Sequence, residues 1–351
     1  MIVLTSSLTV GQKIGNGHFG EVFEGDDPVH GDVAVKVLTR TAAARILGKP
    51  NVSDAEWAEF KSDFLAEAKN LAKATHKNVV QVHHILESDD GKAILFCMEL
   101  CPGGSLQQRF DKGPCNLKEV RDMGVDILLG LDALHRRKML HRDIKPANIL
   151  VGKDRRLKVG DFGLVTDRLI LGYGSQAGYS DHIAYEVWHG NGTSVRTDLW
   201  AFGMTLYRLL HGKHWYGQLP SAEDLIKHGG FVDTLPWLPH IPKRWRRTIR
   251  KIMNDDPKKR FVSAAQSMDA LANLLVAPAW QTEAQPGRIS WTLGLGTRVR
   301  HVEWIIHSPR RHEWRAWSDP VGPGRTKTLG GSVGEVGRLV AIRQLERYFA
   351  D

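Results

Sequence analysis

Apolar residues recur at strand spacing in the first part of the chain and at helical spacing in the second. Residues 8 to about 40 predict short strands around a glycine-rich turn, and "DVAVKVL" predicts a buried strand. "NVVQVHHILE" and "KAILFCMEL" predict two more strands, joined at "SDDG". Between these strand regions, residues 54–75 carry apolar side chains at helical spacing, and Asp54 suits the N-cap.

From residue 105 to residue 278 the spacing predicts helices. The helical segments are "LKEVRDMGVDILLGLDALHRR", "DLWAFGMTLYRLLHG", "KRWRRTIRKIMN" and "AAQSMDALANLLV". A strand-rich lobe followed by a helical lobe is an α+β pattern. The sequence therefore predicts a bilobal fold, with an N-lobe at about 8–99 and a C-lobe at about 105–278.

The pattern changes again near Pro278. "PAWQTEAQPGR" predicts a linker, which we place at residues 279–290. "TRVRHVEWIIHS" and "RRHEWRAWSD" predict two strands, "GPGRTKTLGGS" a glycine-rich loop, and the last residues an amphipathic helix. Residues 291–351 are therefore expected to form a small ββα-like accessory unit.

Composition and charge describe a globular protein with acidic partners. Hydrophobic residues make up 42% of the chain, and the net charge of +9 favours phosphates, nucleic acid or acidic protein surfaces. The three cysteines lack CxxC spacing, which argues against a disulfide framework and a cysteine-ligated zinc site. Because neither a signal peptide nor a run of about 18 apolar residues is found, we expect a cytoplasmic protein without a membrane span.

The glycine-rich turn has the spacing of a phosphate-binding loop. "GNGHFGEV" matches G-x-G-x-x-G-x-V at Gly15, Gly17, Gly20 and Val22, and glycines let a backbone approach phosphates closely. Lys36, in "VAVKV", follows at a distance that suits a lysine neutralising nucleotide phosphates. The alternatives are a common hairpin turn and a lysine that points to solvent.

Lys36 needs an acidic partner, because an unpaired ammonium in an apolar strand is costly. Glu67 is the candidate, since it lies on the predicted helix beside the apolar stripe. A solvated glutamate is the alternative interpretation. The separation of about 30 residues between Lys36 and Glu67 predicts an additional helix or loop before this helix.

The segment "HRDIKPANIL", residues 141–150, carries the strongest chemical signal. Asp143 can accept or orient the proton of an incoming hydroxyl, and Lys145 can neutralise a transferring phosphoryl group. Asn148, with Asp161 of "DFG", offers oxygen ligands for a hard cation that bridges nucleotide phosphates.

Together these motifs resemble the eukaryotic-type Ser/Thr protein kinase family, over a domain expected at residues 8–278. The resemblance implies ATP and Mg²⁺, or Mn²⁺ in its place, as cofactors, and protein hydroxyls as substrates, with autophosphorylation. The lysine of "HRDIKPAN" favours the Ser/Thr branch over tyrosine kinases. An inter-lobe hinge is implied at about 99–104, and the residues implied to contact adenine or its rear pocket are Val22, Ala34, Met98, Glu99, Cys101 and Leu150.

The resemblance also implies residues that hold or regulate the site. Asp198 would bind the backbone of the catalytic segment, and Glu186 would pair with Arg260. The loop after "DFG" offers Thr166, Ser175 and Ser180 as phosphate acceptors. A phosphate on one of them could pair with Arg142, the residue before Asp143. The implied structural and regulatory residues are His141, Arg142, Phe162, Gly163, Glu186, Asp198 and Arg260.

The sequence departs from the family within "GYSDHIAYE". Tyr179 stands where the family has threonine, His182 where it has tyrosine and Tyr185 where it has proline, although a shift of one residue would align Ser180 with the threonine. The departures concern peptide recognition and leave the phosphate-handling residues intact. The alternative function is a nucleotide-binding regulatory or scaffold protein with an inactive or weakly active kinase domain.

Tryptophan and arginine are interleaved in the C-terminal unit. The mixture is compatible with nucleic-acid stacking, with a protein interface, or with a small core that needs large side chains to fold. We expect residues 281–351 to dock a protein partner or substrate, and nucleic acid is the less favoured partner. The tryptophans concerned are Trp280, Trp291, Trp304, Trp314 and Trp317.

Overall fold

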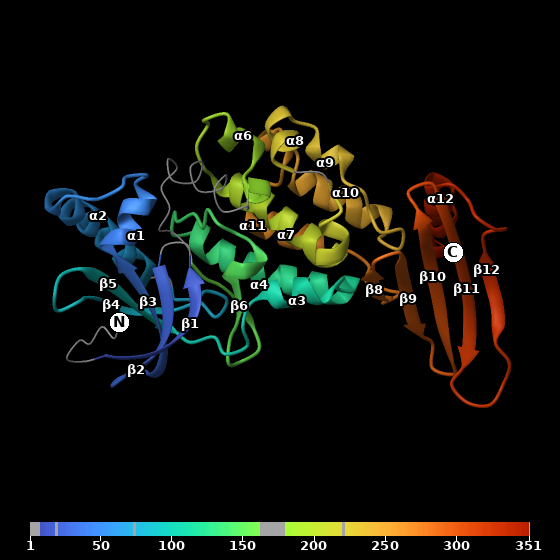
Figure 1. Cartoon of the computed structure of the whole chain (residues 1–351), viewed down its shortest axis with the longest axis horizontal. Helices are drawn as coiled ribbons and strands as arrows, with labels where there is room; N and C mark the ends of the chain where they lie inside the picture. Colours follow the sequence, from blue (N-terminus) through green and yellow to red (C-terminus); the bar gives the residue numbers. More distant parts are fainter. Residues whose placement is uncertain (1–7, 18–19, 73–74, 162–179, 220–221, 351) are drawn as a thin grey trace.

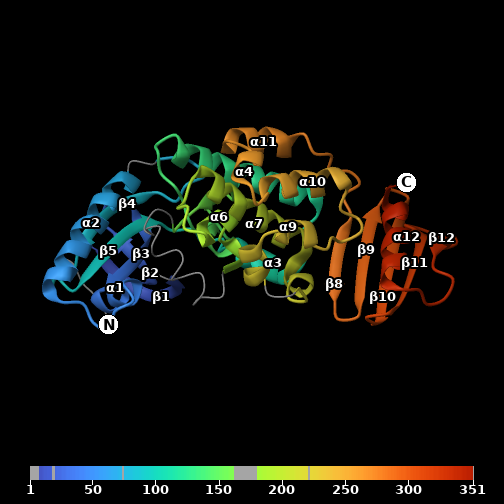
Figure 2. The same ribbon diagram turned by 90° about the horizontal axis from the view of Figure 1, so that it is seen from above.

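A computed structural model describes residues 8–17, 20–72, 75–161, 180–219 and 222–350 of the chain. Three bodies follow one another along its long axis: a sheet with two helices, a helical lobe, and a second sheet (Figure 1). The view from above gives the same order (Figure 2). The predicted α+β class and the bilobal arrangement are confirmed.

The first sheet is antiparallel, in the order β1-β2-β3-β5-β4. Helices α1 (Arg40–Ile46) and α2 (Asp54–Ala72) pack on it, and α1 occupies the stretch where an additional helix or loop was expected. Six consecutive buried residues make β3 the apolar centre of the sheet. The strands are β1 (Thr9–Gly17), β2 (Gly20–Asp27), β3 (Gly31–Thr39), β4 (Val82–Glu87) and β5 (Ala93–Glu99).

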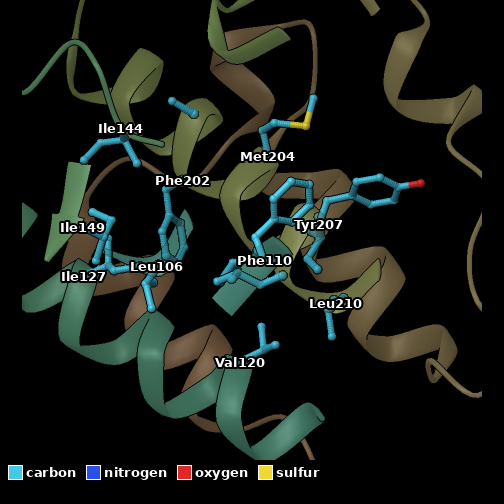
Figure 3. Close-up of a cluster of buried hydrophobic side chains, with 14 of the residues drawn as sticks. Leu106, Phe110, Val120, Ile127, Ile144, Ile149, Phe202, Met204, Tyr207 and Leu210 are labelled. Atoms are coloured by element: carbon cyan, nitrogen blue, oxygen red, sulfur yellow. The ribbon is translucent and has the colours of Figure 1, made fainter. Parts of the chain in front are cut away.

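The helical lobe is built around α4 and α7. Figure 3 shows Phe110 of α3, Val120 of α4 and Phe202 and Tyr207 of α7 in its buried core. No described helix is long and apolar enough to cross a membrane. The helices are α3 (Leu106–Lys112), α4 (Leu117–His135), α6 (Tyr185–Trp188), α7 (Val195–Tyr216), α8 (Ala222–His228), α9 (Phe231–Thr234), α10 (Lys243–Ile252) and α11 (Ala264–Ala272), with 3-10 turns η1 (Pro146–Asn148), η2 (Ser180–His182) and η3 (Pro257–Lys259) and the hairpin β6 (Ile149–Val151) and β7 (Leu157–Val159).

Helix α4 begins at a reciprocal cap. The Asn116 side chain accepts from the Glu119 backbone N–H at 2.9 Å, and the Glu119 carboxylate accepts from the Asn116 N–H at 2.8 Å. Two backbone donors that the helix leaves without partners are thereby satisfied.

We expect the substitution Asn116→Ala to lower the free energy of unfolding by about 1 kcal/mol, because the Glu119 N–H loses its acceptor. Urea unfolding followed by circular dichroism measures the change. Lys118→Ala is the matched control in the same turn: its exposed pair with Asp122, at 2.6 Å, is worth at most about 0.5 kcal/mol. Equal losses in the two variants would contradict the assignment of the cap.

The C-terminal unit has more strands than predicted. Its antiparallel sheet runs β12-β11-β10-β9-β8, with α12 (Arg338–Ala350) packed against β11. The stretch 279–290, expected to be a linker, instead contains β8 and the start of β9, and the expected glycine-rich loop contains β12. The strands are β8 (Gln281–Gln285), β9 (Arg288–Gly294), β10 (Arg298–Ser308), β11 (Arg311–Pro320) and β12 (Lys327–Gly331).

Most tryptophans of this unit are core residues. Trp291 and Trp304 are 0% and 1% exposed, and Trp280 and Trp314 are also buried, whereas Trp317 is half-buried. The packing alternative therefore accounts for four of the five. The partner-docking and nucleic-acid alternatives for the unit stay predictions.

The C-terminal unit packs onto the helical lobe. Trp291 Nε1 donates to His240 Nδ1 at 2.9 Å, and Arg246 of α10 pairs with Glu346 of α12. One continuous hydrophobic cluster includes buried residues of both bodies. The unit lies at the end of the lobe farthest from the first sheet (Figures 1 and 2).

Candidate active site

A cavity of about 580 Å³ lies between the first sheet and the helical lobe. Gly17 and Gly20 pair with each other where β1 turns into β2. The sequence interpretation did not single out Ile14, Val80 or Gln108, which also line the cavity; only Ile14, directly before the glycine motif, carried a local signal. The predicted residues that line it are Gly15, Val22, Ala34, Lys36, Met98, Glu99, Cys101, Lys145, Asn148, Leu150 and Asp161.

Gly20 allows β2 to lie against β3. Its φ is +156°, and a Cβ atom at this position would lie 2.2 Å from the carbonyl oxygen of Val37. Any side chain would therefore push the glycine-rich turn away from the sheet that carries Lys36.

Lys36 reaches the cavity from the centre of β3 and is 3% exposed. Its ammonium pairs with the carboxylate of Asp161, which follows β7. Burial by itself raises the pKa of Asp161, but the charge and hydrogen bond of Lys36, together with the electrostatic effects of Lys145 and His141, outweigh it and hold this pKa below its usual value. Glu67 lies on α2, and its side chain is outside the described part, so its pairing with Lys36 stays a prediction.

The catalytic-looking segment surrounds Asp143 with donors. Asn148 Nδ2 donates to Asp143 Oδ2 at 2.7 Å, and Lys145 Nζ lies 2.8 Å from the same oxygen. Burial raises the pKa of Asp143 despite the Lys145 ammonium. A raised pKa brings a carboxylate closer to the range in which it can accept a proton from a hydroxyl.

Asn148 and Asp161 form a donor set for a hard cation. The Gly160 N–H donates to the Asn148 carbonyl at 2.9 Å beside the β6–β7 hairpin, which brings both side chains to one wall of the cavity. Because Asn148 Nδ2 donates to Asp143, the amide's Oδ1 remains its acceptor atom. An amide oxygen and a carboxylate suit Mg²⁺.

Asp198 and His141 hold the segment in place. The Asp198 carboxylate, 1% exposed, accepts from the His141 N–H at 2.9 Å and the Arg142 N–H at 2.8 Å. His141 Nδ1 accepts from the Asp143 N–H at 3.3 Å, and its Nε2 donates to the Gly160 carbonyl at 3.0 Å. Burial lowers the pKa of His141, which keeps the ring neutral for both bonds.

Two residues of this region have a left-handed backbone, with φ +68° at Arg142 and +57° at Asp161. A non-glycine residue in this region costs about 1–2 kcal/mol, and it persists only where its surroundings hold it. The bond to Asp198 holds Arg142, and the pair with Lys36 holds the side chain of Asp161.

A family model described as "Protein kinase domain" matches residues 8–271. The chain belongs to the protein kinase family. The resemblance to eukaryotic-type Ser/Thr kinases, drawn from the motifs, is confirmed by the match and by the similar proteins. Kinase domains of this family generally use ATP and a divalent metal ion.

Similar proteins come from fungi and bacteria. Cell division control protein 7 of Schizosaccharomyces pombe is 32% identical over 264 residues, or 74% of this chain and 23% of that protein. The probable serine/threonine-protein kinase PknB of Lactococcus lactis is 26% identical over 271 residues, or 74% of this chain and 41% of that protein. The chain spans less than half the length of these curated relatives.

In this kinase domain an ion pair anchors the segment that begins at residue 180. Arg260 donates to both oxygens of Glu186, each at 2.7 Å, and both residues are buried. Tyr185, in the family's proline position, starts α6, and its half-buried ring lies 4.2 Å from that of His189.

His182 joins a buried polar cluster that sequence reasoning missed. Burial lowers the pKa of His182 to about 3, so the neutral ring accepts from Arg208 Nη1 at 2.7 Å. The Arg208 guanidinium lies over the rings of Phe110 and Tyr216, and Tyr216 donates to Asp181. The only local signal was an arginine within an apolar helix.

Several predicted residues lie outside the described part of the chain. They are Phe162, Gly163 and Tyr179, with the candidate phosphate acceptors Thr166 and Ser175. Ser180 begins η2, but its side chain is not described either. The roles assigned to these residues stay predictions.

Proposed function

We propose that the chain is an ATP- and Mg²⁺-dependent Ser/Thr protein kinase that transfers the γ-phosphoryl group to protein hydroxyls and phosphorylates itself. One observation carries the proposal: two buried lysines, two aspartates and an asparagine from three separate segments meet at one cavity, which four of them line while the fifth, Asp143, contacts two of those four. These are Lys36, Lys145, Asp143, Asp161 and Asn148.

The proposed roles follow from charge and position. Asp143 holds the proton of the attacking hydroxyl, and Lys145, beside it, neutralises charge on the transferring group. Lys36 orients the nucleotide phosphates from β3, where it lines the cavity. A Mg²⁺ ion held by Asn148 and Asp161 would supply positive charge between the phosphates.

Two findings make serine and threonine the proposed acceptors. Lys145 of "HRDIKPAN" favours the Ser/Thr branch over tyrosine kinases, and several relatives carry serine/threonine kinase names. A human relative, 29% identical over 267 residues, is named a tyrosine-protein kinase. Phosphoamino-acid analysis of the product therefore separates the two classes. A cytoplasmic location is part of the same proposal.

The test incubates the purified full chain with labelled ATP, Mg²⁺ and a generic basic protein. We expect phosphoserine and phosphothreonine from the wild type, and label reduced about 100-fold in Asp143→Asn. Asp154→Asn is the matched control, since this aspartate pairs with Arg156 at 3.6 Å near the surface.

Undiminished label in Asp143→Asn would overturn the catalytic role. Phosphotyrosine alone would overturn the acceptor class. Nucleotide binding without label in any variant would favour the regulatory or scaffold alternative. The tyrosine that replaces the family's proline is the sequence feature that supports this alternative.

A further inference from the structure

Three potential metal ligands converge in the N-lobe at residues that take no part in the nucleotide cavity. Asp27 ends β2, His30 lies in the turn before β3, and His84 lies on β4. One ligand atom from each lies within 4.8 Å of the others. Two imidazole nitrogens and a carboxylate oxygen form this set.

The three residues belong to parts of the sheet that are not all neighbours. In the order β1-β2-β3-β5-β4, the strands β3 and β5 separate β2 from β4 (Figure 1). The cluster therefore connects strands that share no backbone hydrogen bonds.

A bulge in β4 presents two consecutive histidines to this turn. Val82 pairs with Met98, but His84 pairs with the adjacent Cys97, which leaves His83 as the extra residue. Neighbouring side chains on a regular strand point to opposite faces. Here the His83 ring stacks on that of His30 at 4.0 Å, while His84 contacts Asp27.

Asp27 is the fixed centre of the cluster. Its carboxylate is 3% exposed. Oδ1 accepts from the backbone N–H groups of Val29 and His30 at 3.0 and 2.9 Å and lies 2.8 Å from His30 Nδ1. Oδ2 lies 3.2 Å from His84 Nε2. Capping the turn requires only the Asp27 carboxylate and the two backbone N–H donors. The contacts of the two imidazoles with this carboxylate are therefore not needed for the cap.

We propose that Asp27, His30 and His84 bind one zinc ion, or another late first-row divalent cation, with water completing the coordination. Imidazole nitrogen with one carboxylate oxygen suits zinc, whereas Mg²⁺ and Ca²⁺ prefer oxygen ligands throughout. His83 packs against His30 and holds the orientation of its ring. The bound ion would tie the β2–β3 turn to β4 across the sheet.

The test uses the full chain without a histidine tag, stripped with a chelator and titrated calorimetrically with zinc in excess Mg²⁺, which keeps the oxygen-ligand site at the cavity filled. We expect one zinc ion per chain. We expect His30→Gln and His84→Gln each to weaken zinc binding about 100-fold. Removing a residue that only supports a ligand already costs up to about 100-fold in metal affinity, and the loss of a direct ligand should cost at least as much. Substitution by Co²⁺ gives a visible absorption band in the wild type that the variants lose.

His307→Gln is the matched control, because His307 pairs with Glu313 at 3.6 Å on the C-terminal sheet and, among the described residues, belongs to no cluster of three potential ligands. His30 is the safer variant for folding, since it lies in an exposed turn. Circular dichroism and nucleotide binding report whether each variant keeps its fold.

Two results would overturn the proposal. One is the absence of zinc binding by the wild type at about 100 μM zinc, well above the micromolar affinity of a modest site. The other is stoichiometric binding that is unchanged in both His30→Gln and His84→Gln, since the ion would then lie elsewhere.

Discussion

Asp161→Asn is expected to lower kcat/KM for phosphoryl transfer by about 10³-fold, the upper end of the cost of removing one preorganised electrostatic contact. Asparagine keeps the shape of the side chain but removes its negative charge. Lys36 then loses its ion pair with residue 161, and Asn148 loses the carboxylate beside which it would hold a cation. Initial rates at varied ATP and Mg²⁺ measure the loss and any higher Mg²⁺ requirement.

The backbone of this variant should be retained. Position 161 has φ +57°, and asparagine is among the few non-glycine residues that adopt this region readily. Asp154→Asn, at the exposed pair with Arg156, is the charge-matched control and should leave the rate unchanged. A loss of less than tenfold in Asp161→Asn, with an unchanged Mg²⁺ requirement, would contradict the metal-binding role.

Arg260→Ala is expected to lower the free energy of unfolding by about 3–5 kcal/mol, because it leaves the buried carboxylate of Glu186 without its partner. The guanidinium also donates to the Arg196 carbonyl at 2.9 Å, which loses this donor. With an unfolding entropy of about 2.1 cal/mol/K per residue, the Tm falls by about 4–7 °C. Scanning calorimetry measures the shift.

A second substitution separates the pair from the packing. Adding Glu186→Gln to Arg260→Ala removes the unpaired charge and should recover part of the loss. Arg156→Ala breaks an exposed pair and should change the free energy by at most about 0.5 kcal/mol. A double variant less stable than Arg260→Ala would contradict the unpaired charge as the cause.

The C-terminal unit shows where the sequence interpretation went wrong. "QPGR" was interpreted as part of a linker, but Gln285 pairs with Arg288 across a two-residue turn in which Gly287 has φ +73°. Proline and glycine mark a tight hairpin and a linker alike. Only Thr282 and Ala284 of β8 face inward, so its apolar alternation was too weak to predict a strand.

The helical lobe and the central strands could be predicted because their signals are local. The apolar run of β3 and the periodicity of α4 and α7 lie in single segments, and the predicted elements form there. The contact of Lys36 with Asp161 joins positions 125 residues apart, and the clustering around Arg208 joins three segments. No local pattern encodes either contact.

By itself the sequence determined the α+β kinase class and named the side chains proposed to handle phosphate, because motif residues and their spacing lie within short segments. Only the tertiary structure decided that the C-terminal sheet shares a core with the helical lobe, and that Asp27, His30 and His84 meet. Those contacts depend on strand order, on a bulge at His83 and on packing between distant segments. These are properties of the folded chain and not of any stretch of it.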